Sequence, residues 1–192
     1  MTETHHDVYS KTIFGFLVYL LTDFMMFATL FATFGVLRHS TYGGPSARDL
    51  FHLPFTLTQT LILLVSSLTV GLGGAFAHRQ QKNKTLILFG ITFLLGIVFI
   101  GMEFSEYGQL IRQGASWKRS AFLSAYFTLL GTHAIHVFLG LLWMIVLIIP
   151  VFLSGLTEAS VRRLSCLRMF WQFLNVVWIF IFAIVYVIGV SE

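Results

Sequence analysis

The sequence predicts an all-α membrane protein whose five transmembrane helices form a bundle. Of its 192 residues, 57% are hydrophobic and only 10% are charged, whereas soluble domains carry about 25% charged residues. The apolar residues also gather in five long runs separated by short polar loops, and each run is long enough to cross a bilayer as a helix. A soluble globular domain is therefore excluded.

The five predicted spans form one transmembrane domain, residues 13–192, after a polar tail at residues 1–12. The spans cover residues 13–37, 53–77, 85–110, 121–153 and 169–190. The tail is not expected to start a cleaved signal peptide, because the apolar run after it is longer than a signal-peptide core of about 7–15 residues. Cys166 is the only cysteine, so no intrachain disulfide is expected.

The Lys and Arg residues predict how the chain is oriented. One lies in the tail and three lie in each of the second and fourth loops, which gives seven; the first loop has two and the third has three, which gives five. Cytoplasmic loops carry more Lys and Arg, so we expect a cytoplasmic N-terminus and a C-terminus on the other side. The net charge of +4 does not indicate nucleic-acid binding, because the basic residues are scattered among loops.

The fourth span is the predicted packing centre of the bundle. Its longest apolar run, Phe122–Pro150, contains no charged residue, but it contains two histidines three positions apart. At helical spacing these histidines share a face with other residues of the span, and a polar stripe of this kind is expected to face protein rather than lipid. The stripe comprises Tyr126, Leu129, His133, His136, Gly140 and Trp143.

Three carboxylates fall within predicted spans. Asp23 lies near the middle of the first span, where a charged carboxylate costs roughly 2.5–3.5 kcal/mol. We therefore expect either a neutral acid in an interhelical hydrogen bond or a proton-linked or partner-linked role. Glu103 and Glu106 share one helix face in the last turns of the third span, which predicts an interfacial anchor or salt-bridge site rather than an acid–base pair. No Lys or Arg lies inside a predicted span.

Other residues are expected to mediate packing or lipid contact. Small residues recur every four positions in the second span, which predicts close helix packing; they are Ser67, Gly71 and Ala75, and Gly73 and Ala77. The start of the fifth span is predicted to be a buried polar patch, made by Trp171, Gln172, Asn175 and Trp178. The third loop suits the headgroup level of the membrane through Trp117, Lys118 and Arg119.

The two intramembrane histidines do not predict a haem or metal centre. A bis-histidine haem needs ligands on opposite faces of the porphyrin, which adjacent turns of one helix cannot supply. The other five histidines all lie in tails or loops, so zinc and copper sites lack ligands as well. The chain also contains no phosphate-binding loop or dinucleotide fingerprint.

Six segments, taken in order, resemble subunit III of the haem–copper oxidases, in the short five-helix form found in bo-type ubiquinol oxidases. The segments cover nearly the whole chain after residue 11. They are KTIFGFLVYLLTDFMMFATLFATF, GGPSARDLFHLPF, LILLVSSLTVGL, FIGMEFSEY, SAFLSAYFTLLGTHAIHVFLG and FWQFLNVVWIFIFAIVYV.

The resemblance implies an accessory subunit that binds no haem or copper itself. It would bind directly to subunit I, which carries those groups, in a complex with subunit II and a small subunit IV. Members of the family are thought to stabilise subunit I, hold phospholipid and support proton uptake. A bacterial inner membrane would place the N-terminus in the cytoplasm and the C-terminus in the periplasm. Expected lipid contacts are Trp117, Lys118, Arg119, Trp171 and Trp178.

The resemblance also extends to single positions. Asp23 stands where cytochrome c oxidase relatives carry a reactive intramembrane Glu, and Glu106 and the two histidines match family motifs. The fifth span departs from the family pattern, since neutral amides replace an expected His and Asp. No catalytic residue is expected. The residues expected to be proton-linked or structural are Asp23, Glu103, Glu106, His133, His136, Gln172 and Asn175.

Three alternatives remain open at this point. The first is subunit III of a cytochrome c oxidase. The second is an independent transporter or proton channel that uses Asp23, Glu103 and Glu106, although transporters usually show inverted repeats or broken helices and these spans show neither. The third is a membrane b-type cytochrome, which the shortage of histidine ligands disfavours.

Overall fold

The computed structural model describes residues 5–41 and 53–191, and within them all regular structure is helical. Five helices are long and apolar enough to cross a membrane, which confirms the predicted five-helix membrane bundle. The elements are α1 (His5–Leu37), α3 (Leu53–His78), α4 (Lys82–Arg112), α5 (Ala121–Ser154) and α6 (Glu158–Ile181), followed by a π-helical segment, η1 (Phe182–Val187), and α7 (Ile188–Ser191).

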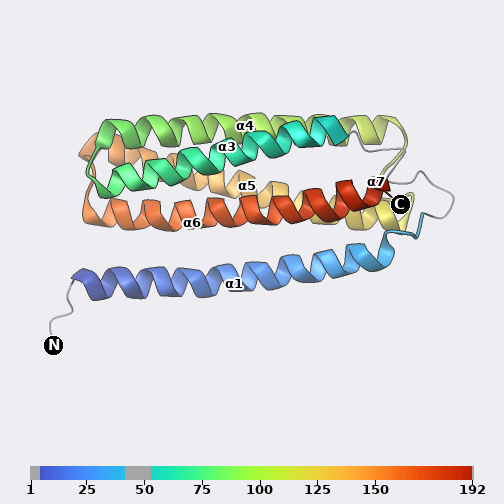
Figure 1. Ribbon diagram of the computed structural model, residues 1–192, viewed down its shortest axis with the longest axis horizontal. Helices are drawn as coiled ribbons and strands as arrows, with labels where there is room; N and C mark the ends of the chain where they lie inside the picture. Colours follow the sequence, from blue (N-terminus) through green and yellow to red (C-terminus); the bar gives the residue numbers. More distant parts are fainter. Residues whose placement is uncertain (1–4, 42–52, 192) are drawn as a thin grey trace.

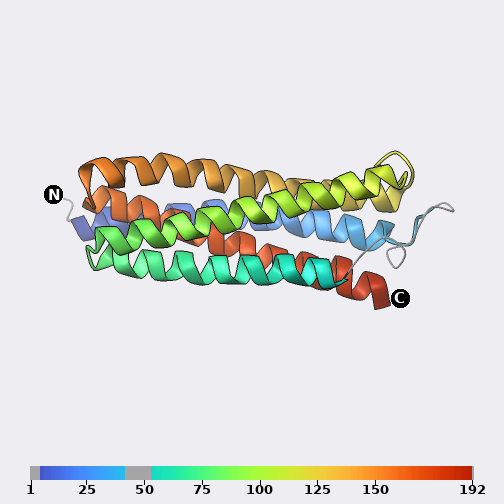
Figure 2. The ribbon, with the colours of Figure 1, turned by 90° about the horizontal axis from the view of Figure 1, so that it is seen from above.

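Four of the helices form a closed ring, and the fifth lies outside it. Helix α3 packs against α4 and α6, and α5 packs against the same two helices from the other side. Helix α1 runs along the bundle and contacts α5 and α6 (Figures 1 and 2). The described part of the protein is therefore a four-helix bundle with one peripheral helix.

Helix α1 attaches to the ring through a single stripe of side chains. Leu20, Phe27 and Phe34 are buried and recur every seven residues, while most of the rest of α1 is exposed. The Phe27 ring has its centroid 5.3 Å from that of His136 on α5 and 6.3 Å from that of Phe173 on α6. This aromatic side chain therefore sits where α1 meets the other two helices.

Two helices begin earlier than hydropathy predicts. Helix α1 begins at His5, so residues 5–12 of the predicted tail are helical. Helix α6 begins at Glu158 and is capped by Thr157, whose hydroxyl accepts a hydrogen bond from the Ser160 N–H at 3.2 Å. The predicted fourth loop, Ser154 to Arg168, is thus mostly helix. Hydropathy detects the apolar part of a helix and misses the turns that continue it into the headgroup region.

Glycines let the indole ring of Trp171 enter the centre of the ring of helices. An ideal Cβ atom built on Gly96 of α4 would lie 2.9 Å from Cη2 of Trp171 and 2.7 Å from Cδ2 of Leu141. A Cβ atom on Gly140 of α5 would lie 3.2 Å from the same indole. The absence of side chains at these two positions therefore sets how closely α4, α5 and α6 approach.

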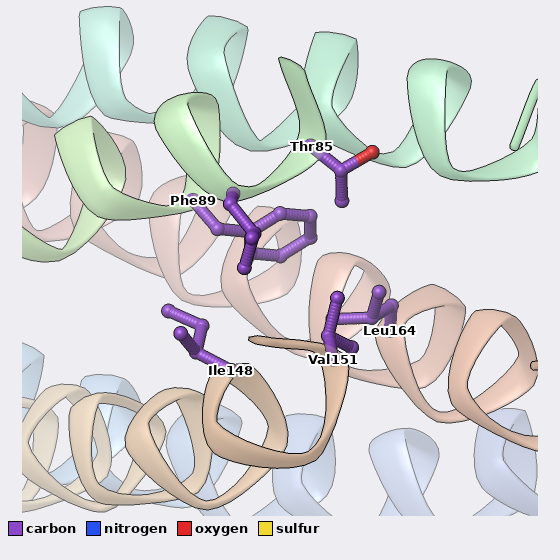
Figure 3. Close-up of a pocket in the computed structure, with 6 residues that line it drawn as sticks. Thr85, Phe89, Ile148, Val151 and Leu164 are labelled. Carbon is purple, nitrogen blue, oxygen red and sulfur yellow. The ribbon is translucent and has the colours of Figure 1, made fainter. Parts of the chain in front are cut away.

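An apolar, tightly packed region lies between α4, α5 and α6 near the α3–α4 turn. Figure 3 shows a gap there between α4, α5 and α6, and it has no room for a water molecule. Its lining is aliphatic and aromatic apart from one threonine: Thr85, Leu86, Phe89, Ile148, Val151 and Leu164. This gap therefore holds no water.

We predict that Gly96→Ala destabilises the bundle by about 1–3 kcal/mol, the usual cost of overpacking a core, because the rigid Trp171 ring cannot move aside. Gly101→Ala is the matched control: it lies on the same helix and a Cβ atom there would have no neighbour within 4 Å. Thermal unfolding in detergent measures both changes. Equal midpoints for the two variants would contradict the packing described here.

Candidate functional site

Buried polar side chains gather in the half of the bundle nearest the α4–α5 loop. They come from α3, α4, α5 and η1, and they face the centre of the ring. We call this group the polar core; it comprises Gln59, Glu103, Glu106, Tyr126, His133 and Tyr186.

Glu106 is the hydrogen-bonding centre of the polar core. Its Oε1 lies 2.9 Å from the Tyr186 hydroxyl and 3.3 Å from the Tyr126 hydroxyl, and these hydroxyls lie 2.9 Å from each other. The Gln59 amide donates to Oε2 at 3.4 Å. Each tyrosine has one hydroxyl hydrogen, so two hydrogens cannot fill all three contacts. A proton on Glu106 would supply the third, and the arrangement therefore suits a carboxyl group that holds a proton.

Glu103 lies one turn before Glu106 and is more completely enclosed. Its side chain is 1% exposed, and its neighbours include Tyr107 and Glu106. Burial of a carboxyl group is costly unless it is paired and hydrogen-bonded, so Glu103 depends on these neighbours. Both residues lie in the last three turns of α4, as predicted, but their side chains are buried in the bundle, with Glu106 only 9% exposed. An interfacial anchor or salt-bridge role for them remains a prediction.

The two histidines of α5 differ in their surroundings. His133 is buried; its Nε2 donates to the Leu174 carbonyl oxygen at 3.2 Å, and its ring centroid lies 5.2 Å from that of Trp178. His136 is half-buried, and its Nδ1 donates to the Thr132 carbonyl oxygen at 2.8 Å. The polar stripe predicted on this helix does face protein: Tyr126, Leu129, His133 and Gly140 are buried, and His136 and Trp143 are half-buried.

Two tryptophans of α6 form hydrogen bonds to α3. The Trp171 indole N–H donates to the Ser66 hydroxyl at 2.7 Å, and the Trp178 N–H donates to Thr60 at 3.1 Å. Each indole is only 1% exposed. Their expected contact with lipid is therefore wrong, because both side chains point into the bundle.

The two amides of α6 do not share one environment. Asn175 is buried as predicted, and its Nδ2 donates to the Trp171 carbonyl oxygen at 2.8 Å. Gln172 is exposed, contrary to the predicted buried patch. It is the next residue after the inward-facing Trp171, and successive residues are turned by about 100° on a helix. The rotation carries Gln172 to the outer edge of the α3–α6 contact.

Asp23 lies outside the polar core. It is half-buried in the packing stripe of α1, between Leu20 and Phe27, and its Oδ2 is buried without a hydrogen-bond partner among the described residues. Helix α1 and helix α4 lie on opposite sides of the molecule (Figure 1). The structure therefore does not bring Asp23 together with Glu103 and Glu106 as a single acidic pathway.

The loop between α4 and α5 places its aromatic and basic residues at the surface. Trp117, Lys118 and Arg119 are exposed. Arg119 donates to the Gly114 carbonyl oxygen at 3.1 Å, and Trp117 contacts Phe127 edge-on, with a centroid distance of 6.2 Å. Contact of this loop with lipid headgroups remains a prediction.

Sequence reasoning missed two features of the site. It did not pair Glu106 with Gln59, Tyr126 and Tyr186, because these residues come from three other segments and no local spacing links them. It also placed Arg168 in a loop, whereas Arg168 lies inside α6. Across residues 5–41 and 53–191, no group of three His, Cys, Asp or Glu side chains could hold a metal ion.

The comparisons with known proteins identify the family. Residues 2–190 match the model of the family described as cytochrome c oxidase subunit III. The chain belongs to this family. It is 50% identical over 184 residues to the cytochrome bo(3) ubiquinol oxidase subunit 3 of Pseudomonas aeruginosa. The aligned residues cover 96% of this chain and 88% of that relative. The family expected from the sequence motifs is thus confirmed.

Two further subunit III relatives are similar over most of their length. The cytochrome bo(3) ubiquinol oxidase subunit 3 of Pseudomonas putida is 45% identical over 185 residues, covering 96% of this chain and 89% of that protein. The cytochrome c oxidase subunit 3 of Bacillus sp. strain PS3 is 41% identical over 179 residues, covering 91% and 84%. The family therefore includes proteins named for two different electron donors.

We predict that Glu106→Leu destabilises the bundle by about 1–3 kcal/mol, because it leaves buried tyrosine and glutamine groups without their acceptor. Glu106→Gln keeps a carbonyl oxygen that can accept from Tyr186 and should cost clearly less. The change in thermal unfolding midpoint, followed by tryptophan fluorescence in detergent, compares the two variants. Equal losses would show that the hydrogen bonds at Glu106 contribute little.

Proposed function

We propose that this chain is accessory subunit III of a haem–copper ubiquinol oxidase in a bacterial inner membrane. The observation that carries the proposal is the 50% identity with the P. aeruginosa ubiquinol oxidase subunit 3 over 96% of this chain. In this proposal, subunit I holds the haem and copper groups and transfers electrons from ubiquinol to oxygen. This chain binds directly to subunit I, alongside subunit II and a small subunit IV, with its N-terminus in the cytoplasm.

The chain contributes stability rather than catalytic groups. The polar side chains of the bundle interior are directed at one another: Glu106 at two tyrosines, Trp171 at Ser66 and Trp178 at Thr60. These hydrogen bonds between helices make the four-helix ring rigid, so a large membrane subunit can pack against its surface. Glu103 and Glu106 can hold protons near that surface, which fits a supporting role in proton uptake.

The chain also holds phospholipid in apolar surface grooves. One groove of about 430 Å³ lies between α4 and α5, and Tyr107 is among its lining residues. Phe127 contacts both Tyr107 and Trp117, so the groove leads toward the exposed Trp117, Lys118 and Arg119. An acyl chain in the groove would have its headgroup near these cations. A second groove of about 490 Å³ lies between α1 and Phe173 of α6.

A cytochrome c oxidase is the second candidate for the parent complex. The observation that favours it is the 41% identity with the cytochrome c oxidase subunit 3 of Bacillus sp. strain PS3. The two candidates share the fold and the accessory role of this chain, and they differ in the electron donor of subunit I.

Gentle purification through a tag on this chain should recover a haem-containing complex that consumes oxygen with ubiquinol and not with reduced cytochrome c. After dissociation, this chain alone should contain no stoichiometric haem, copper or zinc, because no ligand set spans its helices. Oxygen consumption with reduced cytochrome c alone would establish the second candidate instead. One metal per isolated chain, lost in His133→Ala, would contradict the accessory role.

We predict that Asp23→Asn leaves assembly and initial ubiquinol oxidation largely intact, because Asn keeps the shape and hydrogen-bonding capacity of a neutral acid. Sustained turnover should show faster inactivation or weaker proton uptake. A hydrophobic carbodiimide should label the wild-type chain at Asp23, which lies on the peripheral helix, and spare the variant. Loss of oxidation at the first turnover in a fully assembled complex would place Asp23 on the catalytic path.

A further inference from the structure

Arg168 is an arginine inside a membrane-spanning helix, and it lies in the groove between α6 and α3. An ideal Cβ atom on Gly74 of α3 would lie 2.7 Å from Cδ of Arg168 and 3.1 Å from Nη1. The arginine can therefore lie across α3 only because residue 74 is glycine. Its Nε is buried and has no hydrogen-bond partner among the described residues. The groove thus contains a cation whose Nε is left without a hydrogen-bond partner by the described residues.

The carboxylates of the described side chains do not neutralise Arg168. Asp23 is on the peripheral helix α1, while Glu103 and Glu106 belong to the polar core in the other half of the bundle. Glu158 lies at the first turn of α6, ten residues before Arg168 or roughly 15 Å along a helix. A guanidinium group stays charged at any ordinary pH, so Arg168 would attract an anion that reaches this groove.

Gln172 lies one turn after Arg168 in the same groove. It is exposed, and its Nε2 is 3.6 Å from an ideal Cβ atom on Gly71. Both long polar side chains of α6 therefore lie over glycines of α3, Arg168 over Gly74 and Gln172 over Gly71.

The same groove becomes apolar beyond Gln172. Val176 and Ile179 follow on the same face of α6, and Leu64 follows Gly71 two turns away on α3; all three are exposed. Along the groove, starting at the C-terminal end of α3, the Arg168 cation comes first, the Gln172 amide second and the aliphatic side chains last.

Arg168 lies beside the end of α3, where a membrane-spanning helix is expected to approach the headgroup level of the bilayer. Gly74, beneath its side chain, lies four residues before the last residue of α3, His78, or roughly 6 Å inside the helix end. An arginine at this depth extends its charged group toward the phosphates. Gln172 lies one turn deeper, where the glycerol esters of a phospholipid present carbonyl acceptors, and the aliphatic residues lie beside the acyl chains.

We infer that Arg168 and Gln172 form a phospholipid-binding site in the α3–α6 groove. The guanidinium group binds the phosphate, the amide donates to a glycerol ester carbonyl, and one acyl chain lies along Leu64, Val176 and Ile179. The inference deepens the lipid-holding part of the proposed function. It assigns a site at the end of the bundle opposite Trp117, Lys118 and Arg119. A carboxylate on a partner helix is the competing occupant. It would bind Arg168 without contacting Gln172 and the aliphatic side chains that follow it.

Native mass spectrometry of the assembled complex tests the site. Arg168→Leu should remove one bound phospholipid per complex while every protein subunit stays present, and Gln172→Leu should weaken retention of the same lipid. Arg163→Leu is the matched control, because it removes an exposed arginine near the same end of α6. An unchanged lipid count in Arg168→Leu overturns the inference. Loss of a protein subunit with all lipid retained identifies a partner carboxylate and also overturns it.

A second measurement uses the wild-type complex and does not depend on the variant assembling. After delipidation, the complex is incubated with dioleoyl phosphatidylglycerol or with dioleoylglycerol, which has the same acyl chains and esters but no phosphate. The phospholipid should rebind at least about tenfold more tightly, the effect of one charge-assisted hydrogen bond. Equal binding overturns the inference. Oxygen consumption with ubiquinol on the same preparation tests the proposed function separately.

Discussion

The packing of the four-helix ring depends on the contacts of the Trp171 indole. From α6 the indole reaches the slot left by Gly96 on α4 and Gly140 on α5, and its N–H donates to Ser66 on α3 at 2.7 Å. One side chain thus touches all four helices of the ring. In a bilayer, apolar surface alone does not drive helices together, so close packing and interhelical hydrogen bonds must do so. Trp171 supplies both at the centre of the ring.

The polar core follows from the same constraint. Buried polar groups within a membrane protein must find their partners inside it, and Glu106 finds them on α3, α5 and η1. Tyr186 lies in the π-helical segment at the end of α6, a type of segment that often occurs at functional sites. Glu103, Glu106 and His133 are therefore members of an interior polar core that is separate from Asp23 on α1.

Hydropathy predicted the number and order of the helices, because a helix that crosses a bilayer needs a long uncharged run of residues. The helical spacing of polar residues predicted that the stripe of α5 that includes His133 faces the protein interior. Ordered motifs predicted the family. Depth was harder to predict, because the distance of a residue from the end of its hydropathy window is not its distance from water. For this reason the burial of Glu103 and Glu106 was not predicted, and Arg168 was placed in a loop. The orientation of Gln172 relative to Trp171 depends on where α3 lies, which sequence spacing does not contain.

The single contact stripe of α1 has a consequence for biosynthesis. In chain order, two other long helices, α3 and α4, separate α1 from its packing partners, α5 and α6. Phe173 follows Phe27 by 146 residues, so their rings can meet only after α6 has been made. Helix α1 therefore spends most of translation inserted in the bilayer without these partners, and its docking onto the ring is a late step of folding.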